Sequence, residues 1–209
     1  MSVTLLLLTA CLKGPTPEVA VSNHVLDTRP TIGAAADYMP PSATSQTLDN
    51  GATLWVLPKP GLPLISLRMI VGGGKAVDST GMSGVTSFTD SMLTHGAADK
   101  DATAFAAAAE DAAVSIGFGT GDSNSWGSLD THTDKLALGL SLFADAVISP
   151  RFDAAEVETL RSQRMASLAQ SKDDPRTKAT WLSDTLYFGA EHPLSNPSIG
   201  NATSITATT

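Results

Sequence analysis

The chain has 209 residues, of which 42% are hydrophobic and 16% are charged, and its formal net charge is -8 at pH 7. This composition is typical of a globular protein that buries its own core, and it excludes a disordered chain. Because the charge is negative and lysine and arginine form no cluster, we expect no binding to nucleic acid.

The N-terminus carries an apolar run, residues 3–10, directly before the only cysteine, Cys11. The run is too short to span a bilayer but long enough for the core of a signal peptide. The segment LTAC, residues 8–11, resembles the lipobox of bacterial lipoproteins, although no Lys or Arg precedes the apolar run. The resemblance implies a signal peptide over residues 1–10 and lipidation of Cys11. The alternative is an apolar N-terminus with a buried cysteine.

A lipid at Cys11 implies a protein of the bacterial cell envelope. Leu12 after the cysteine is compatible with sorting to the outer membrane, facing the periplasm, as in similar lipoproteins, and leaves the other membrane open. Residues 11–43 contain five prolines among Ser, Thr and Asp without hydrophobic periodicity, which predicts a flexible tether. We expect a folded domain over residues 44–209. Its first feature is Asp49-Asn50-Gly51, a strong signal for a hairpin turn.

The elements expected after this turn alternate between strands and helices. Ile65, Leu67, Met69 and Val71 recur at every second residue, as in a strand that buries one face. The later elements are a helix over 84–95, a helix over 101–113 that begins at Asp101, a strand pair over 113–131, and helices within 131–150, 153–171 and 176–189. This order predicts an α+β fold, with helices packed on one face of an antiparallel sheet. Residues 192–209 are expected to form a loop and a polar tail without a helix, as in a domain truncated at its C-terminus.

The first of these helices carries a polar face. Ser87, Asp90 and Ser91 recur at spacings of three and four residues and therefore share that face. In the zinc motif H-x-x-E-H, two imidazoles bind the metal and the Glu activates water. The frame here has the same spacing, with serine in both His positions and Asp in place of Glu. Because serine hydroxyls are poor zinc ligands, we expect neither a metal nor a catalytic residue at this site.

The surrounding segment, residues 47–97, resembles the opening of the pitrilysin/insulinase metallopeptidases, the group that includes mitochondrial processing peptidase. It has their L-x-N-G pattern before a strand and a second strand that runs into a glycine-containing loop. Gly84 matches the glycine before the motif, and Met92-Leu93 with Gly96 match its M-L-x-x-G end. The chain thus resembles an incomplete N-terminal domain of this family with a degenerate zinc motif.

Two later segments, residues 149–179 and 186–200, resemble the family's long helix and the loop after it. The family's third zinc ligand, a Glu on that helix, falls by spacing near residues 166–168. These positions hold Ala, Ser and Leu.

The family builds a chamber from two halves, and often only one half carries zinc. The other half binds an extended substrate chain by adding it to a sheet edge. The resemblance therefore implies a non-catalytic, zinc-free scaffold or substrate-binding half, whose partners are a zinc-bearing subunit of the same family, a peptide substrate and a membrane. Two alternatives are an active zinc metalloendopeptidase that uses ligands outside the motif, and an envelope binding or structural lipoprotein.

Other polar and aromatic residues have structural interpretations. His95 is expected to cap the C-terminus of the motif helix, and His132 and His192 to be solvated or structural. Asp90 is expected to be a solvated or hydrogen-bonded helix residue. Three aromatic residues are expected in the core: Trp126, Trp181 and Phe143.

Overall fold

The computed structural model describes Gly33, Asp37 and residues 39–208. The chain divides into two units, Met1–Pro58 and Lys59–Thr209, and each is described by itself. The predicted signal peptide and Cys11 lie outside the described residues, as does most of the tether. No helix in the part of the chain that is described is both long and apolar enough to cross a bilayer.

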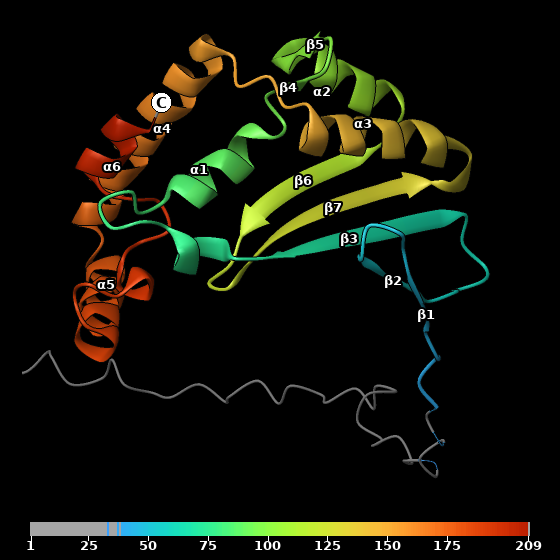
Figure 1. Ribbon diagram of the computed structural model, residues 1–209, viewed down its shortest axis with the longest axis horizontal. Helices are drawn as coiled ribbons and strands as arrows, with labels where there is room; N and C mark the ends of the chain where they lie inside the picture. Colours follow the sequence, from blue (N-terminus) through green and yellow to red (C-terminus); the bar gives the residue numbers. More distant parts are fainter. Residues whose placement is uncertain (1–32, 34–36, 38, 209) are drawn as a thin grey trace, which may run out of the picture. The chain divides into compact units, whose positions relative to one another are not determined.

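In the first unit, β1 (Thr44–Thr47) and β2 (Thr53–Val56) form an antiparallel hairpin (Figure 1). The Asn50 side chain accepts a hydrogen bond from the Ala52 N–H at 3.0 Å. Gly51 has a φ of +84°, a conformation that a glycine adopts without strain. The predicted hairpin turn is confirmed.

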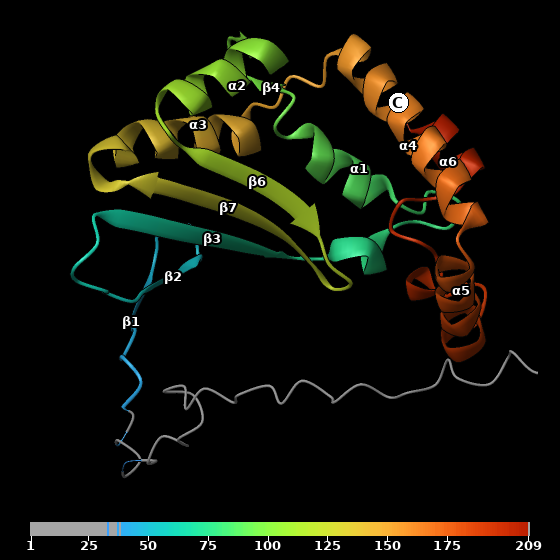
Figure 2. The same cartoon turned by 180° about the vertical axis from the view of Figure 1, so that it is seen from behind.

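The second unit is built on a three-stranded antiparallel sheet in the order β3-β7-β6. Its strands are β3 (Leu64–Gly72), β6 (Ser115–Thr120) and β7 (Asn124–His132). Three helices lie on one face of the sheet (Figures 1 and 2): α1 (Val85–Met92), α2 (Ala102–Asp111) and α3 (Leu136–Ile148). The fold is therefore α+β with helices on one face of an antiparallel sheet, as predicted.

The sheet face toward these helices carries large apolar side chains from all three strands: Leu67, Met69, Ile116, Phe118 and Leu129. The ring of Phe143 from α3 stacks on Phe118 with a centroid distance of 5.2 Å. Gly127 makes room for this stack, because a Cβ there would lie 2.7 Å from the Phe143 ring. The predicted alternation holds through Met69, whereas Val71 is half exposed at the strand's end.

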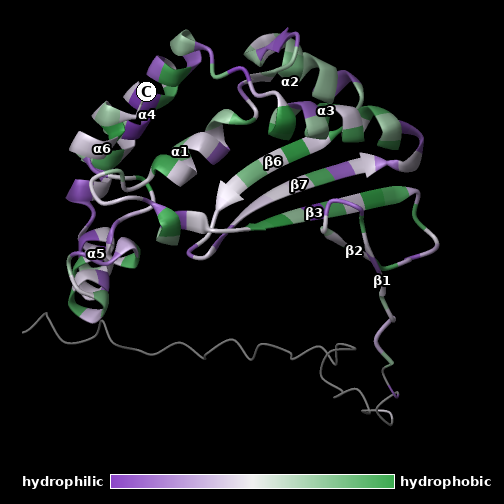
Figure 3. Ribbon diagram, in the orientation of Figure 1, coloured by the Kyte–Doolittle hydropathy of each residue, from purple (hydrophilic) through white to green (hydrophobic). Residues whose placement is uncertain are grey.

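Helices α2 and α3 pack against each other and on the sheet. The Asp101 carboxylate accepts a hydrogen bond from the Ala104 N–H at 2.8 Å, so Asp101 is the predicted N-cap of α2. Phe105 of α2 is buried with Leu142 and Ala146 of α3. Figure 3 shows α3 as mostly hydrophobic, which agrees with its place over the core.

The second half of the unit is helical, with α4 (Ala154–Asp173), α5 (Pro175–Phe188) and α6 (Ala202–Ala207). Short elements connect the rest: β4 (Gly96–Ala97), β5 (Lys100–Asp101) and the 3-10 helices η2 (Gly74–Val77), η3 (Thr133–Lys135) and η4 (Pro193–Ser195). Phe88 and Met92 of α1 pack on Leu160 of α4 in a separate core cluster.

Helix α6 corrects the prediction that residues 192–209 form a loop without a helix. Asn201 and Ser204 form a capping box at its start. Ile205 is 2% exposed, and the Arg161 guanidinium donates to the Ile205, Thr206 and Thr208 carbonyls at its end. Ile205 is the only large apolar side chain of α6, so the helix has no periodic apolar pattern in the sequence. Its tertiary contacts stabilise it instead.

The three aromatic residues predicted for the core have different surroundings. Phe143 is buried, and Trp181 is partly buried. Trp126 is 38% exposed on the sheet face away from the helices, so its core assignment is wrong. Its ring covers Gly119, where a Cβ would lie 2.6 Å from the ring, and the Arg68 guanidinium lies 5.7 Å from the ring centroid. The Trp126 side chain therefore contacts neighbouring residues on the surface of the sheet and does not pack in the core.

Candidate functional site

The orientation of α1 is fixed at its first turn by Asp78. One carboxylate oxygen accepts from the Gly84 N–H at 2.7 Å, and the other accepts from the Thr86 N–H at 3.0 Å and the Thr86 hydroxyl at 2.6 Å. Asp78 is 9% exposed, and its negative charge suits a helix N-terminus. These bonds determine where the side chains of the polar face point.

The loop before α6 packs directly on the same turn. Gly84 has a φ of +84°, and a Cβ there would lie 2.6 Å from the Gly200 nitrogen. The Asn201 amide donates to the Ser83 hydroxyl at 3.2 Å. Two glycine backbones thus meet at the start of α1, which holds the C-terminal segment against the motif helix.

Ser87 and Ser91 face Arg164 of α4. The Arg164 Nη2 donates to the Ser87 carbonyl at 2.7 Å, the Ser87 hydroxyl at 3.1 Å and the Ser91 hydroxyl at 2.9 Å. The guanidinium carbon also lies 5.1 Å from the Phe88 ring centroid, a cation–π contact. Arg164 is only 8% exposed. Burial lowers the pKa of Arg164, but an arginine side chain remains charged in a protein.

Asp90 points toward the sheet. Its Oδ2 accepts from the Thr120 hydroxyl at the end of β6 and from the Ser125 hydroxyl of β7, the latter at 2.6 Å. Thr120 and Ser125 are paired across the two strands. The three positions of the motif frame therefore do not converge on one point, because the serines bind α4 while Asp90 binds the sheet.

This donor set does not fit a zinc ion. Zinc in proteins takes imidazole, thiolate or carboxylate ligands that converge in a tetrahedron. Here two hydroxyls share the space with a guanidinium cation, which repels a second cation. Among the described residues, no three His, Cys, Asp or Glu side chains lie close enough together to hold a metal ion.

The histidines lie apart from the motif face. The His95 Nδ1 lies 2.9 Å from a carboxylate oxygen of Glu156 on α4, so its side chain does not cap α1 as predicted. This hydrogen bond instead connects the residues that follow α1 to α4. His132 contacts Asp134 on the surface, and the His192 ring accepts from the Leu194 N–H at 3.2 Å. The latter two contacts are local, as expected for structural histidines.

Sequence reasoning missed Arg164. The family's spacing places its third zinc ligand near residues 166–168. Of these, Ala166 and Ser167 are exposed and Leu168 is buried. Arg164 lies one helical turn before Leu168, and Leu160 one turn before that, so all three share the buried face of α4. A charged residue inside a series of leucines at intervals of four was the signal that could have found it.

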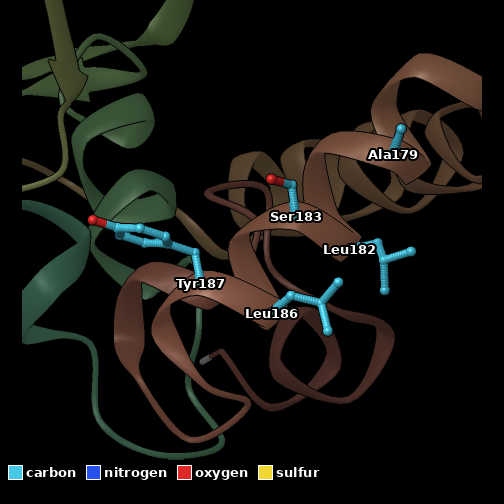
Figure 4. Close-up of a pocket in the computed structure, with 5 residues that line it drawn as sticks. All are labelled: Ala179, Leu182, Ser183, Leu186 and Tyr187. Carbon is cyan, nitrogen blue, oxygen red and sulfur yellow. The ribbon is translucent and has the colours of Figure 1, made fainter.

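A hollow of about 480 Å³ lies elsewhere, on the surface of α5. Figure 4 shows that its lining residues all come from this one helix, and that Leu182 and Leu186 project on the same side. Its polar groups are the Ser183 hydroxyl and the Tyr187 phenol. An apolar groove on one helix offers no set of groups that would carry chemistry.

The fold is that of the pitrilysin and peptidase M16 structures, as comparison with solved structures shows. The peptidase M16 inactive domain from Pseudomonas fluorescens matches with a TM-score of 0.76 and 29% identity, over 80% of this chain and 40% of that chain. A protease from Helicobacter pylori matches with a TM-score of 0.70 and 18% identity, over 81% of this chain and 41% of that chain. Pitrilysin itself matches with a TM-score of 0.67 and 20% identity, over 81% of this chain and 18% of that chain.

The chain therefore spans less than half the length of each of these structures. No protein-family model and no curated protein matches it. The fold that the sequence resemblance implied is confirmed by the structural matches.

Proposed function

We propose that the chain is a non-catalytic, zinc-free member of the pitrilysin/insulinase family, and that it forms the scaffold or substrate-binding half of a two-subunit peptidase. The partner subunit, of the same family, carries the zinc. The observation that supports this most is the contact of Arg164 with Ser87 and Ser91. If Ser87 and Ser91 correspond to the motif histidines, as the sequence resemblance implies, this fixed cation lies where an active relative would hold its metal.

The chemistry of metal-dependent hydrolysis supports the non-catalytic role. Such hydrolysis needs a metal that polarises the scissile carbonyl and a base that activates water. The only carboxylate of the motif frame, Asp90, is held by two hydroxyls at the sheet. The match to a domain described as inactive, at 29% identity, agrees with this proposal.

The sheet offers a way to bind a peptide. In the described part of the second unit, β6 is an edge strand with β7 as its sheet neighbour. An extended chain can add to such an edge through main-chain hydrogen bonds. Because β6 ends at Thr120, which contacts Asp90, a peptide added there would pass beside the former catalytic face.

The anchor belongs to the same proposal. A lipid at Cys11 and a tether up to residue 43 would hold the domain at the outer membrane, facing the periplasm. Replacing Cys11 by Ser removes the acceptor thiol, so we expect the full chain to move from the membrane fraction to the soluble fraction. An unchanged distribution between the fractions would contradict the anchor without affecting the peptidase proposal.

The test of the peptidase role mixes the full chain with a zinc-bearing family member from the same organism. We expect the isolated chain to cleave no peptide with or without added zinc, and the mixture to show a lower KM or a higher kcat than the partner alone. An equal concentration of an unrelated protein is the control. If the chain forms no complex and leaves the partner's rate unchanged, the proposal is wrong.

The same experiment separates the alternatives. Hydrolysis by the isolated chain, together with stoichiometric zinc, would identify an active enzyme with other ligands. Absence of any zinc-bearing relative in the organism would favour an envelope lipoprotein without a role in proteolysis.

A further inference from the structure

We propose that Arg164 and Ser87 form an anion site that binds a carboxylate of the peptide held by this domain. The inference rests on the proposed function and adds the chemical class of ligand that the site at Arg164 and Ser87 accepts. It follows from three features of the site: unused donors, the absence of a counter-ion among the described residues, and access to solvent.

The first feature is the set of unused donors. A guanidinium has five N–H groups, and every hydrogen bond of Arg164 within the described residues goes through Nη2. The N–H groups of Nε and Nη1 have no acceptor there. The Ser87 hydroxyl accepts from Arg164, and among the described residues it donates to none. The free groups are thus all donors, which complement an anion rather than a cation.

The second feature is the lack of a counter-ion. No Asp or Glu in the described part of the chain lies within ion-pair distance of Arg164. The neighbouring arginines differ in this respect, because Arg151 pairs with Asp153 and Arg161 with Glu158. A buried charge is rarely left without a partner, since desolvating it is unfavourable.

The third feature is access. Every solvent-inaccessible side-chain nitrogen and oxygen in the described residues has a hydrogen-bond partner. Because Nε and Nη1 of Arg164 have none, they keep contact with solvent. A carboxylate that meets this exposed surface would accept charge-assisted hydrogen bonds, which are about twice as strong as neutral ones.

A carboxylate reaches such a site from two sources in a peptide, the C-terminus and an Asp or Glu side chain. Three short peptides of one neutral sequence separate them. The first is amidated, the second has a free C-terminus, and the third is amidated and carries one central Glu. Calorimetric titration into the full chain measures each Kd.

We expect the second or the third peptide to bind about tenfold tighter than the first. Arg164→Gln should remove this preference, and Arg164→Lys should keep part of it, since the charge remains. Arg176→Gln, which removes an exposed arginine from α5, is the matched control and should leave the preference unchanged. Equal affinities of the three peptides for the unmodified chain would overturn the inference and leave the proposed function intact. Binding of none of them would also contradict the peptide-binding role.

A second measurement does not depend on the folding of a variant. In the unmodified chain, the NMR signal of the Arg164 Nε–H should shift on addition of the preferred peptide and stay in place with the amidated neutral one. A signal that responds to neither peptide, while both bind, would show that Arg164 only joins α1 to α4, and the inference would be wrong.

Discussion

The Nη2 of Arg164 lies 2.9 Å from the hydroxyl of Ser91, on the helix position where the metallopeptidases that this chain resembles carry a motif histidine. The contact crosses from α4 to α1, the two helices on which the sequence resemblance places the family's zinc ligands. Two unit charges 4 Å apart near a protein surface interact by about 4 kcal/mol, and a divalent ion by about twice as much. We therefore expect the guanidinium to oppose the binding of a zinc ion at this position.

Introducing histidines at the two serine positions tests this expectation. In the variant Ser87→His with Ser91→His, we expect weak zinc binding, because Arg164 still places a positive charge beside both positions. Adding Arg164→Ala should raise the zinc affinity by about tenfold or more. Competition with a chromophoric chelator measures both affinities. Equal affinities with and without Arg164 would contradict this expectation, and Arg164→Ala alone, without the histidines, is the control.

The contact between Gly84 and Gly200 predicts an unusually sensitive glycine. Gly84→Ala adds a methyl group that would lie 2.6 Å from the Gly200 nitrogen, and it forces alanine into a positive φ. Gly81 has the same φ of +84°, but a methyl group added there would meet no atom within 4 Å, so Gly81→Ala is a matched control. We expect Gly81→Ala to lower the free energy of unfolding by about 1–2 kcal/mol and Gly84→Ala by clearly more. Urea unfolding measures both, and equal losses would contradict the close contact.

Asp78 should contribute more to stability than an ordinary helix cap. Asp78→Ala removes a buried carboxylate that accepts three hydrogen bonds, so we expect a loss of about 3 kcal/mol. Asp101→Ala removes one exposed cap bond of α2, and about 1 kcal/mol is expected. Amide exchange should also rise in the first turn of α1 for Asp78→Ala only. Similar losses in the two variants would mean that Asp78 does not fix α1.

Acid should loosen the start of α5. The Thr177 hydroxyl and then its N–H bind the Asp174 carboxylate and lower the pKa of Asp174 from its ordinary value of 3.8. A lowered pKa in the folded state means that the stabilisation is complete above pH 3.8 and is lost as the pH falls through the folded-state pKa. The protection of the Arg176 and Thr177 amides, corrected for the intrinsic pH dependence of exchange, should therefore fall as the pH drops through the folded-state pKa of Asp174. In Asp174→Asn, which has no carboxylate, this dependence should be absent, and its persistence there would contradict the assignment.

Much of the fold could be predicted because it depends on local signals. The Asn50-Gly51 turn, the Asp101 cap and the alternation from Ile65 to Met69 each follow from backbone or burial preferences of a few neighbouring residues. The same holds for the helices on either side of Pro175. These signals are strong enough to give the class of fold and the helix that carries Ser87, Asp90 and Ser91.

The features that were missed depend on contacts between distant segments. Helix α6 is held by Arg161 and by the approach of Gly200 to Gly84, and neither contact has a local pattern. Trp126 faces away from the helices because the register of β7 decides its side of the sheet. Arg164 reaches the motif face only because α4 packs along α1. The shared helix face of Ser87 and Ser91 was therefore predictable, whereas the arginine that contacts both hydroxyls was not.

The most direct test of the central claim is the zinc content of the purified full chain, measured by elemental analysis after exposure to excess zinc and removal of unbound metal. The account predicts no stoichiometric zinc, because Ser87 and Ser91 bind Arg164 instead. One zinc per chain would contradict it, and hydrolysis of a peptide by that zinc-loaded chain would identify the protein as an active peptidase.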